Sequence, residues 1–263
     1  MLKGGLVADR KRYWNHSVAR GMRVLELFES GREEMTLSQI ARNMDTAPSG
    51  IYAIVSTLEE LGCLIRNPET KQYRLGLKIL ELASRLIGSL DIRDEAKATL
   101  RRLAADHRAN SHLAVLFDGE VLYIDTEIAA ATFVLPEIIG RRAPSYCTAL
   151  GKALLAHNPD AADRVFASEP FRAMTPRTIT TADKLRRQLL QVVERGHAVD
   201  REEFHEGLVC IAAPIRNFRG EVVAALSISV AATRLKQEAL SGFVESVMRG
   251  AREVSERMGL ATV

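Results

Sequence analysis

The chain has 263 residues, of which 47% are hydrophobic and 26% charged, and its formal net charge at pH 7 is +3. This length can hold two modest domains with separate cores, and the composition excludes a disordered or fibrous chain. No apolar run reaches the ~18 residues of a membrane-spanning helix, and the N-terminus lacks the apolar core of a secretory signal. The three cysteines are widely spaced and odd in number. We therefore expect a cytoplasmic protein with no disulfide framework and no membrane partner.

The N-terminal segment 1–14 is expected to be a flexible arm, followed by a supporting helix from Ser17 to Glu29. Arg10, Lys11 and Arg12 in the arm either contact a nucleic acid or remain solvated. The chain up to Leu80 holds twelve basic and nine acidic residues, whereas the remainder is balanced. All the net positive charge thus lies where a DNA-binding domain would need it, although an excess of three is weak evidence alone.

The stretch 36–76 has the layout of a winged helix-turn-helix. Thr36 and Gln39 have the spacing of a capping box, and Pro48 restarts the chain in a second helix. Two short apolar segments then flank a turn at 67–71, as in a hairpin. The apolar stripe of the second helix consists of Ile51, Ile54, Val55, Leu58 and Leu61. DNA binding is the interpretation that this order favours, with an ordinary packed helical hairpin as the alternative.

Residues expected to contact DNA lie on the second helix, opposite its apolar stripe, and on the hairpin. The helix face carries hydroxyl groups but no Lys or Arg, whereas the hairpin carries the positive charge. We therefore expect modest base contacts from the helix and phosphate contacts from the hairpin. A solvent-exposed hairpin without a partner is the alternative. The candidate DNA-binding residues are Thr36, Ser49, Gly50, Tyr52, Ala53, Ser56, Arg66, Lys71 and Arg74.

A linker helix is predicted over 77–91, after a winged helix-turn-helix domain over 15–76. Its apolar stripe from Leu77 to Leu90 requires a partner, either a second chain or the next domain. A further helix begins near Asp91 and opens the remaining domain, 92–263.

The domain over 92–263 has the sequence pattern of an α+β sensor domain, with antiparallel hairpins between helices. Apolar runs on both sides of Asp118-Gly119 predict one hairpin, and 208–216 with 221–230 predict another. A further strand is possible at 132–135. Helices are expected over 148–156, 181–195 and 235–258.

The domain over 92–263 contains no strong catalytic motif, such as a P-loop, GxSxG, HExxH or CxxC. Paired arginines before a helix start at Thr148 favour an anionic ligand, as would any capped helix. Ser227 and Ser229 share one face of a strand, as core hydroxyls or as polar anchors in a pocket.

The residues leave two rival functions open, an enzyme and a protein-binding module. Cys210 on an apolar strand favours plain core over a nucleophile, so a hydrolase with a regulatory head is a rival rather than the prediction. A metal site would require the fold to bring together Cys147, Cys210, His112 and Asp200, and we expect none. The second rival is an interaction module whose N-terminal domain binds a protein.

Four segments together resemble the IclR (isocitrate lyase regulator) family of bacterial transcription regulators. They are TLEELGCL…YRLG (57–76), SHLAV…GEVLYID (111–125), GRRAPSYCTALGKALLA (140–156) and ERGHAVDREEFHEGLVCIAAPIRNFRGEVVAALSIS (194–229). The resemblance implies a winged helix-turn-helix, a linker helix and a GAF-like antiparallel-sheet domain that binds an effector. It further implies a homodimer or tetramer that binds double-stranded operator DNA and responds to a small organic, carboxylic or aromatic acid, with no catalysis and no cofactor.

The resemblance also implies where the effector binds. Matching positions on the loop and helix start are Ala143, Ala149 and Leu150, and on the sheet Asp200, Cys210, Ser227 and Ser229. One position departs from the family pattern, because Ala53 stands where many relatives have an arginine in the recognition helix. Either the hairpin and the arm compensate for this missing contact, or the operator differs. We expect the hairpin, from Arg66 to Arg74, to supply most of the contact with phosphate.

Overall fold

The computed structural model describes residues 14–28, 32–88, 91–129, 139–235 and 240–260. It divides into two compact units, Met1–Ser89 and Leu90–Val263. Most of the predicted arm and the possible strand at 132–135 lie outside the described residues.

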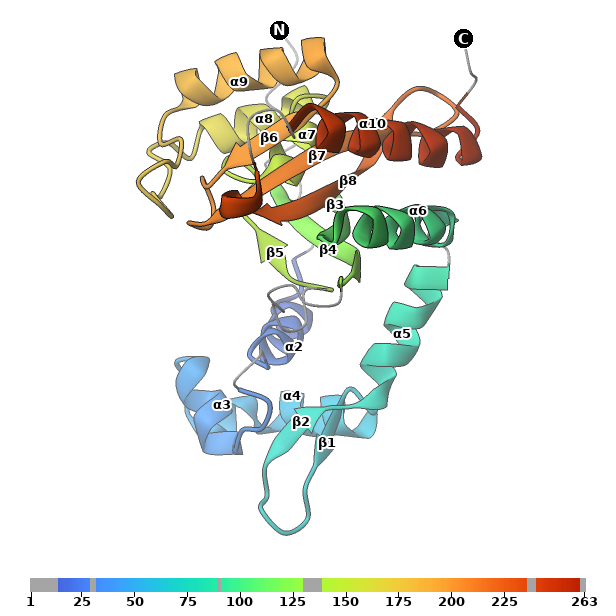
Figure 1. Cartoon of the computed structure of the whole chain (residues 1–263). Coiled ribbons are helices and arrows are strands. Elements are labelled where there is room, and N and C mark those ends of the chain that lie inside the picture. The colour runs from blue at the N-terminus through green and yellow to red at the C-terminus, as the bar shows by residue number, and fades with distance from the viewer. Residues whose placement is uncertain (1–13, 29–31, 89–90, 130–138, 236–239, 261–263) are drawn as a thin grey trace, which may run out of the picture. The chain divides into compact units, whose positions relative to one another are not determined.

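The first unit is a winged helix-turn-helix followed by a further helix, as the sequence predicted (Figure 1). Its elements are α2 (His16–Glu26), α3 (Leu37–Asn43), α4 (Pro48–Glu60), β1 (Leu64–Arg66), β2 (Tyr73–Leu75) and α5 (Leu77–Gly88). The predicted capping box is present, with the Thr36 amide donating to Gln39 Oε1 at 2.7 Å and the Gln39 amide donating to Thr36 Oγ1 at 3.3 Å. Pro48 occupies the first turn of α4, where its missing N–H costs nothing.

Two boundaries of this unit differ from the sequence prediction. The first helix ends at Glu26 rather than Glu29, and its start is capped by the side chain of Asn15. Leu61 was expected in the buried stripe of α4, but it lies just beyond the helix and 61% of it is exposed. The stripe therefore ends one turn earlier, and a core of α2, α3, α4 and the hairpin forms around Ile40, Ile51 and Tyr73.

The helix α5 leaves apolar side chains in solvent. Leu77 is 75% and Leu80 61% exposed. An apolar face of this kind normally packs against a partner.

The second unit is built on one antiparallel sheet in the order β5-β4-β3-β8-β7-β6. Its strands are β3 (Asn110–Phe117), β4 (Glu120–Glu127), β5 (Arg142–Ala143), β6 (Ala198–Arg201), β7 (Leu208–Arg216) and β8 (Val222–Ala231). Both predicted hairpins are confirmed. Asp118 and Gly119 join β3 and β4 with φ of 52° and 81°, the two positive values of a type I′ turn.

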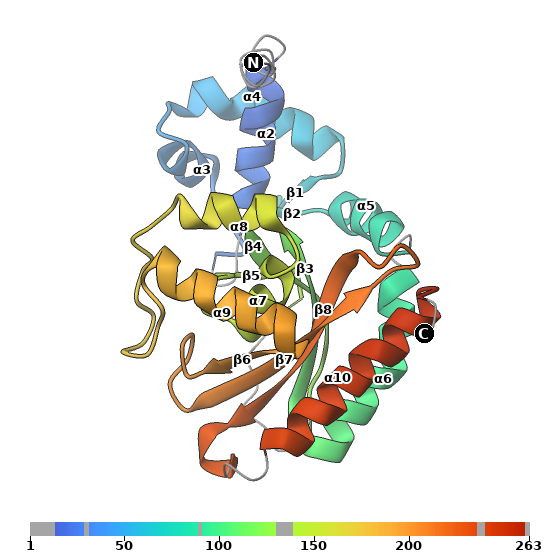
Figure 2. The ribbon, with the colours of Figure 1, turned by 90° about the horizontal axis from the view of Figure 1, so that it is seen from above.

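Helices cover both faces of this sheet. They are α6 (Asp91–His107), α7 (Ala149–Leu155), α8 (Pro159–Phe166), α9 (Ala182–Arg195) and α10 (Leu240–Arg257), with a 3-10 turn at Ala232–Arg234. Helices α6 and α10 lie side by side on one face, around Leu100, Leu226 and Val247 (Figure 2). On the other face α7 packs against β7, and α8 and α9 pack outside it. The sequence prediction did not include α8, although Asn158 followed by Pro159 is a recognised signal for the start of a helix.

Candidate effector pocket and DNA-binding surface

A cavity of about 150 Å³ lies between the start of α7 and the sheet. Six of the seven residues expected to contact an effector line it, and the seventh, Asp200, does not. The lining consists of His112, Tyr123, Arg141, Arg142, Ala143, Thr148, Ala149, Leu150, Phe204, His205, Leu208, Cys210, Ser227 and Ser229.

The strand register explains how distant residues meet in this cavity. Ser229 pairs with Cys210 across β7 and β8, and Ser227 pairs with His112 across β8 and β3. The Cys210 Sγ and Ser229 Oγ atoms are 3.2 Å apart, within hydrogen-bond distance for sulfur. His112 is held by Thr126, whose Oγ1 lies 3.1 Å from the imidazole Nδ1.

The sheet side of the cavity is uncharged at neutral pH. Burial lowers the pKa of His112 to about 4, so the imidazole is neutral. Burial also raises the pKa of the Cys210 thiol to about 12 and raises that of Tyr123, so neither ionises. These groups can offer hydrogen bonds to a ligand but no ionic attraction.

On the α7 side of the cavity, the backbone of Gly151 lies very close to the backbone of Ser145. A Cβ on Gly151 would lie 2.3 Å from Cα and O of Ser145, so only glycine fits there. Thr148 caps α7 by accepting from the Gly151 amide at 3.1 Å, and its hydroxyl donates to the Pro144 carbonyl at 2.8 Å. The Gly151 amide is therefore already bonded, and the cap fixes the positions of Ala149 and Leu150.

Arg141 and Arg142, the two arginines of the cavity lining, differ in their side-chain partners. The Arg142 guanidinium lies over the Phe117 ring at 4.6 Å and 3.3 Å from Glu120 Oε2. Arg141 is exposed and makes no side-chain hydrogen bond or ion pair within the described residues. Arg141 is thus the arginine of this pair that is available to an anion at the cavity.

Asp200 supports the wall of the cavity instead of lining it. It is 2% exposed, and its Oδ1 accepts a hydrogen bond from the Glu203 amide at 2.7 Å. Burial raises the pKa of this carboxyl to about 7, against the opposing effect of the Glu203 amide bond. Its role in the structure is to hold the segment 202–207, which we call the strap.

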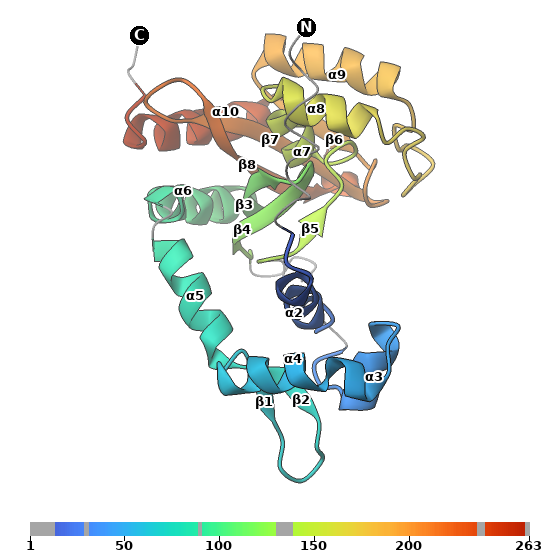
Figure 3. The same ribbon diagram turned by 180° about the vertical axis from the view of Figure 1, so that it is seen from behind.

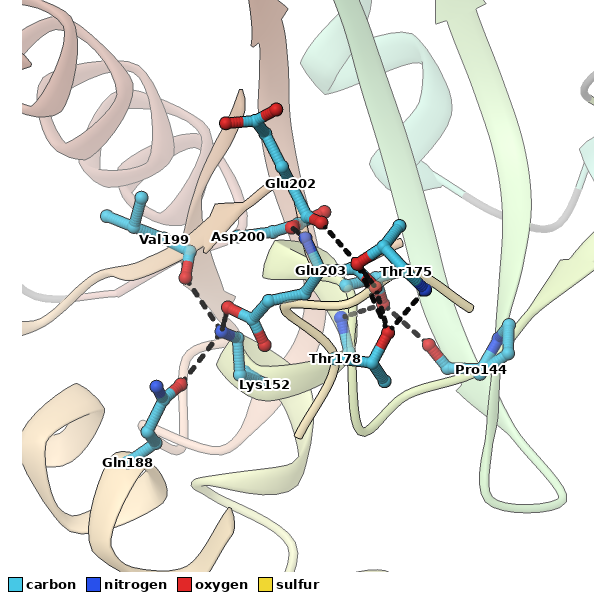
Figure 4. Close-up of polar contacts among 11 residues, drawn as sticks. Pro144, Lys152, Thr175, Thr178, Gln188, Val199, Asp200, Glu202 and Glu203 are labelled. Carbon is cyan, nitrogen blue, oxygen red and sulfur yellow. Dashed lines mark hydrogen bonds and ion pairs between the residues drawn. The ribbon is translucent and has the colours of Figure 1, made fainter. Parts of the chain in front are cut away.

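A buried lysine on α7 connects the strap to the rest of the unit (Figure 4). Lys152 is fully buried, and its Nζ donates to Glu203 Oε1 at 2.5 Å, the Val199 carbonyl at 2.7 Å and Gln188 Oε1 at 2.8 Å. These acceptors come from the strap, β6 and α9. All three ammonium protons are used, which is the condition under which a buried charge is tolerated.

Two threonine hydroxyls hold the strap from the opposite side. Thr175 Oγ1 donates to the Glu202 carbonyl at 2.7 Å, and Thr178 Oγ1 donates to the Glu203 carbonyl at 2.6 Å. The next two residues of the strap, Phe204 and His205, line the cavity. The polar network therefore positions part of the cavity wall without itself lining the cavity.

On the first unit, the predicted recognition face of α4 is open to solvent. Ser49, Gly50, Tyr52 and Ala53 are exposed, and Ser56 is half-buried. The Thr36 side chain is bonded in the predicted capping box, which limits its freedom to contact DNA.

The three predicted cationic residues of the hairpin are all exposed. Figure 3 shows the β1–β2 hairpin extending from the first unit beside α4. Arg66 lies over the Tyr73 ring at 5.6 Å, and Arg74 has no side-chain partner among the residues described. Lys71 differs, because its Nζ donates to the Pro68 carbonyl at 2.6 Å within the turn.

A metal site and a membrane span each place requirements on the described part of the chain. It contains no group of three or more His, Cys, Asp or Glu side chains that could hold a metal ion. None of its helices is long and apolar enough to cross a membrane.

Comparisons with known proteins cover most of the chain and agree with one another. The family model for the bacterial transcriptional regulator IclR C-terminal domain matches residues 84–256, and that for the IclR helix-turn-helix domain matches 17–68. The HTH-type transcriptional regulators XynR and KdgR of Escherichia coli K12 are each 32% identical to this chain in sequence. The alignments cover 92% of this chain and 97% of XynR or 94% of KdgR.

Solved structures of IclR proteins share the fold. An IclR homolog from Microbacterium hydrocarbonoxydans, complexed with 4-hydroxybenzoate, superposes with a TM-score of 0.82 at 28% identity, covering 92% of this chain and 98% of that chain. The IclR of Thermotoga maritima gives 0.73 at 27% identity with the same coverages. The chain therefore belongs to the IclR family, whose members are DNA-binding transcriptional regulators with an effector domain and not enzymes.

Proposed function

We propose that this protein is a cytoplasmic regulator that binds operator DNA as an oligomer and responds to a small carboxylic or aromatic acid in the α7 cavity. The observation that carries the proposal is the combination of a cavity of about 150 Å³, a neutral polar sheet side and Arg141, an exposed arginine with no side-chain partner among the described residues.

The size and chemistry of the cavity favour a ligand with a single ring or a short chain. An apolar cavity of ~150 Å³ in another protein is large enough to hold benzene. The hydroxyls of Ser227 and Ser229 supply neutral hydrogen bonds, and Arg141 supplies the complementary charge for a carboxylate. The relative that was solved with 4-hydroxybenzoate holds a ligand of this class.

An oligomer is favoured by the exposed leucines of α5. Leu77 and Leu80 lie on the linker helix, next to the DNA-binding domain, and need a partner surface. A twofold dimer would pair two such faces and match a palindromic operator.

Calorimetric titration of the full-length protein tests the effector class. We expect 4-hydroxybenzoate and benzoate to bind at least tenfold more tightly than 4-hydroxybenzyl alcohol, because the alcohol lacks the carboxylate. Equal affinity for the acids and the alcohol would contradict the proposed charge recognition.

Gel shifts test the operator half of the proposal. The DNA upstream of the protein's own gene should bind about 10³-fold more tightly than random duplex at physiological salt. Affinity no better than for random duplex would contradict it. A bound acid should then change that affinity, and mass spectrometry of the purified protein should detect any acid that copurifies.

A further inference from the structure

The composition of α4 restricts how this helix can read DNA. None of its thirteen residues, Pro48–Glu60, is Arg, Lys, Asn or Gln, and the structure describes every one of them. Arg and Lys make the bidentate contacts that identify guanine in the major groove, and Asn and Gln make those that identify adenine. Neither kind of contact is available from this helix.

The exposed face of α4 offers methyl, ring and hydroxyl groups instead. Tyr52 is 55% exposed, and its hydroxyl has no hydrogen bond within the described residues. Ala53 presents a bare methyl group beside it. The Thr57 hydroxyl is already used, because it donates to the Ala53 carbonyl at 2.8 Å.

The N-terminal half of α4 carries small residues and packs closely against its own unit. Gly50 has no side chain, and a Cβ there would lie 2.8 Å from Thr46 Oγ1. Its carbonyl accepts a hydrogen bond from Arg20 at 3.0 Å, which ties the first turn to α2. The opposite end carries Glu59 and Glu60, whose charges repel phosphate.

We propose that α4 reads thymine through its 5-methyl group. The Ala53 methyl and the Tyr52 ring pack against thymine methyls, and Ser49 adds a single hydrogen bond. The 5-methyl group is the apolar feature that thymine alone presents in the major groove. This inference rests on the proposed function, since it requires α4 to enter the groove of an operator.

Selection from a random duplex library with the full-length protein provides the sites for the test. We expect enriched half-sites that contain thymine at the positions beneath α4. Replacing one such thymine with uracil removes only the methyl group. Affinity should fall about fourfold, the equivalent of one buried methyl group.

A double-mutant cycle then identifies the protein partner of that methyl. Ala53→Gly should weaken binding to the thymine site and abolish the sensitivity to uracil. Glu60→Gly is the control for glycine at the other end of α4, away from the proposed contact, and its sensitivity to uracil is compared rather than its absolute affinity. Glu60→Gly should still lose about fourfold in affinity when uracil replaces thymine.

Two results would overturn the inference while leaving the regulator proposal intact. One is a selected site at which uracil replacement has no effect at any position. The other is a half-site read through guanine, shown when methylation of guanine N7 beneath α4 blocks binding. Failure to enrich any sequence would instead refute the operator-binding proposal, and this inference with it.

Discussion

At the scale of single residues, the candidate site depends on groups whose chemistry is set by burial. Ser227 is 1% exposed and faces the cavity, beside a neutral His112. The strand pattern alone left open whether the two serines were core hydroxyls or pocket anchors, and the family resemblance favoured pocket anchors. Their place in the cavity lining favours the second interpretation, which ligand titration can decide.

Ser227→Ala and Ser229→Ala should each weaken binding of the acid about three- to tenfold, because each removes one neutral hydrogen bond. DNA affinity without effector should not change, since both serines lie in the other unit. Titration calorimetry and gel shifts measure the two quantities. Unchanged ligand affinity in both variants would return these serines to the core-hydroxyl interpretation.

Asp200 should make folding stability depend on pH. Its pKa is about 7 in the folded state, above its ordinary value of 3.8, so the folded state binds the proton more tightly than the unfolded state. Stability from this group therefore falls as pH rises from about 4 to 7 and is level above that range. Lys152 and Glu203 are the charged groups facing it, and the neutral Cys210 pairs with it across β6 and β7.

The matched variant is Asp200→Asn, which keeps an oxygen for the Glu203 amide but does not titrate. We expect urea unfolding to show that the free energy of unfolding falls by roughly 1–4 kcal/mol more in the wild type than in the variant between pH 5 and pH 7.5. The same pH dependence in both proteins would show that Asp200 is not the titrating group.

At the scale of elements, one buried lysine joins α7, α9, β6 and the strap. Removing its charge leaves Glu203, which is itself 5% exposed, without its partner. A broken buried ion pair is costly, whereas an apolar replacement of both partners can be nearly neutral.

Lys152→Met should destabilise the protein by roughly 3–5 kcal/mol. Lys152→Met/Glu203→Leu should recover most of that loss, as urea unfolding can measure. Hydrogen exchange should accelerate first in 202–207, because the variant releases the strap before the sheet. Equal acceleration in β7 and β8 would show a general loss of stability instead. Gln188→Leu, which removes a neutral acceptor only, is the milder control.

The β1–β2 hairpin is the second element with a measurable role. Arg66→Ala and Arg74→Ala should each weaken binding to all DNA sequences and reduce the salt slope by about one. Lys71→Ala should do less, since its ammonium is bonded to Pro68. Gel shifts at several salt concentrations measure this, and a loss confined to one base position would contradict a phosphate contact.

At the scale of the whole molecule, the exposed α5 leucines connect structure to assembly. Leu80→Asp should shift the protein toward monomer and lower operator affinity, because two linked DNA-binding domains bind more tightly than one. Sedimentation at micromolar protein concentrations measures the mass. A variant that keeps both the wild-type mass and the operator affinity would place the oligomer interface elsewhere.

The sequence by itself determined the winged helix-turn-helix and both hairpins, because these depend on local signals, and four segments along the chain identified the family. The Thr36–Gln39 capping box, Pro48 and Asp118-Gly119 each act within a few residues. Only the tertiary structure decided which side chains share the cavity. Alternation along a strand shows which residues share a face, but not which strand pairs with which. The strand order β3-β8-β7 brings His112 to Ser227 and Cys210 to Ser229, and it leaves Asp200 to hold the strap.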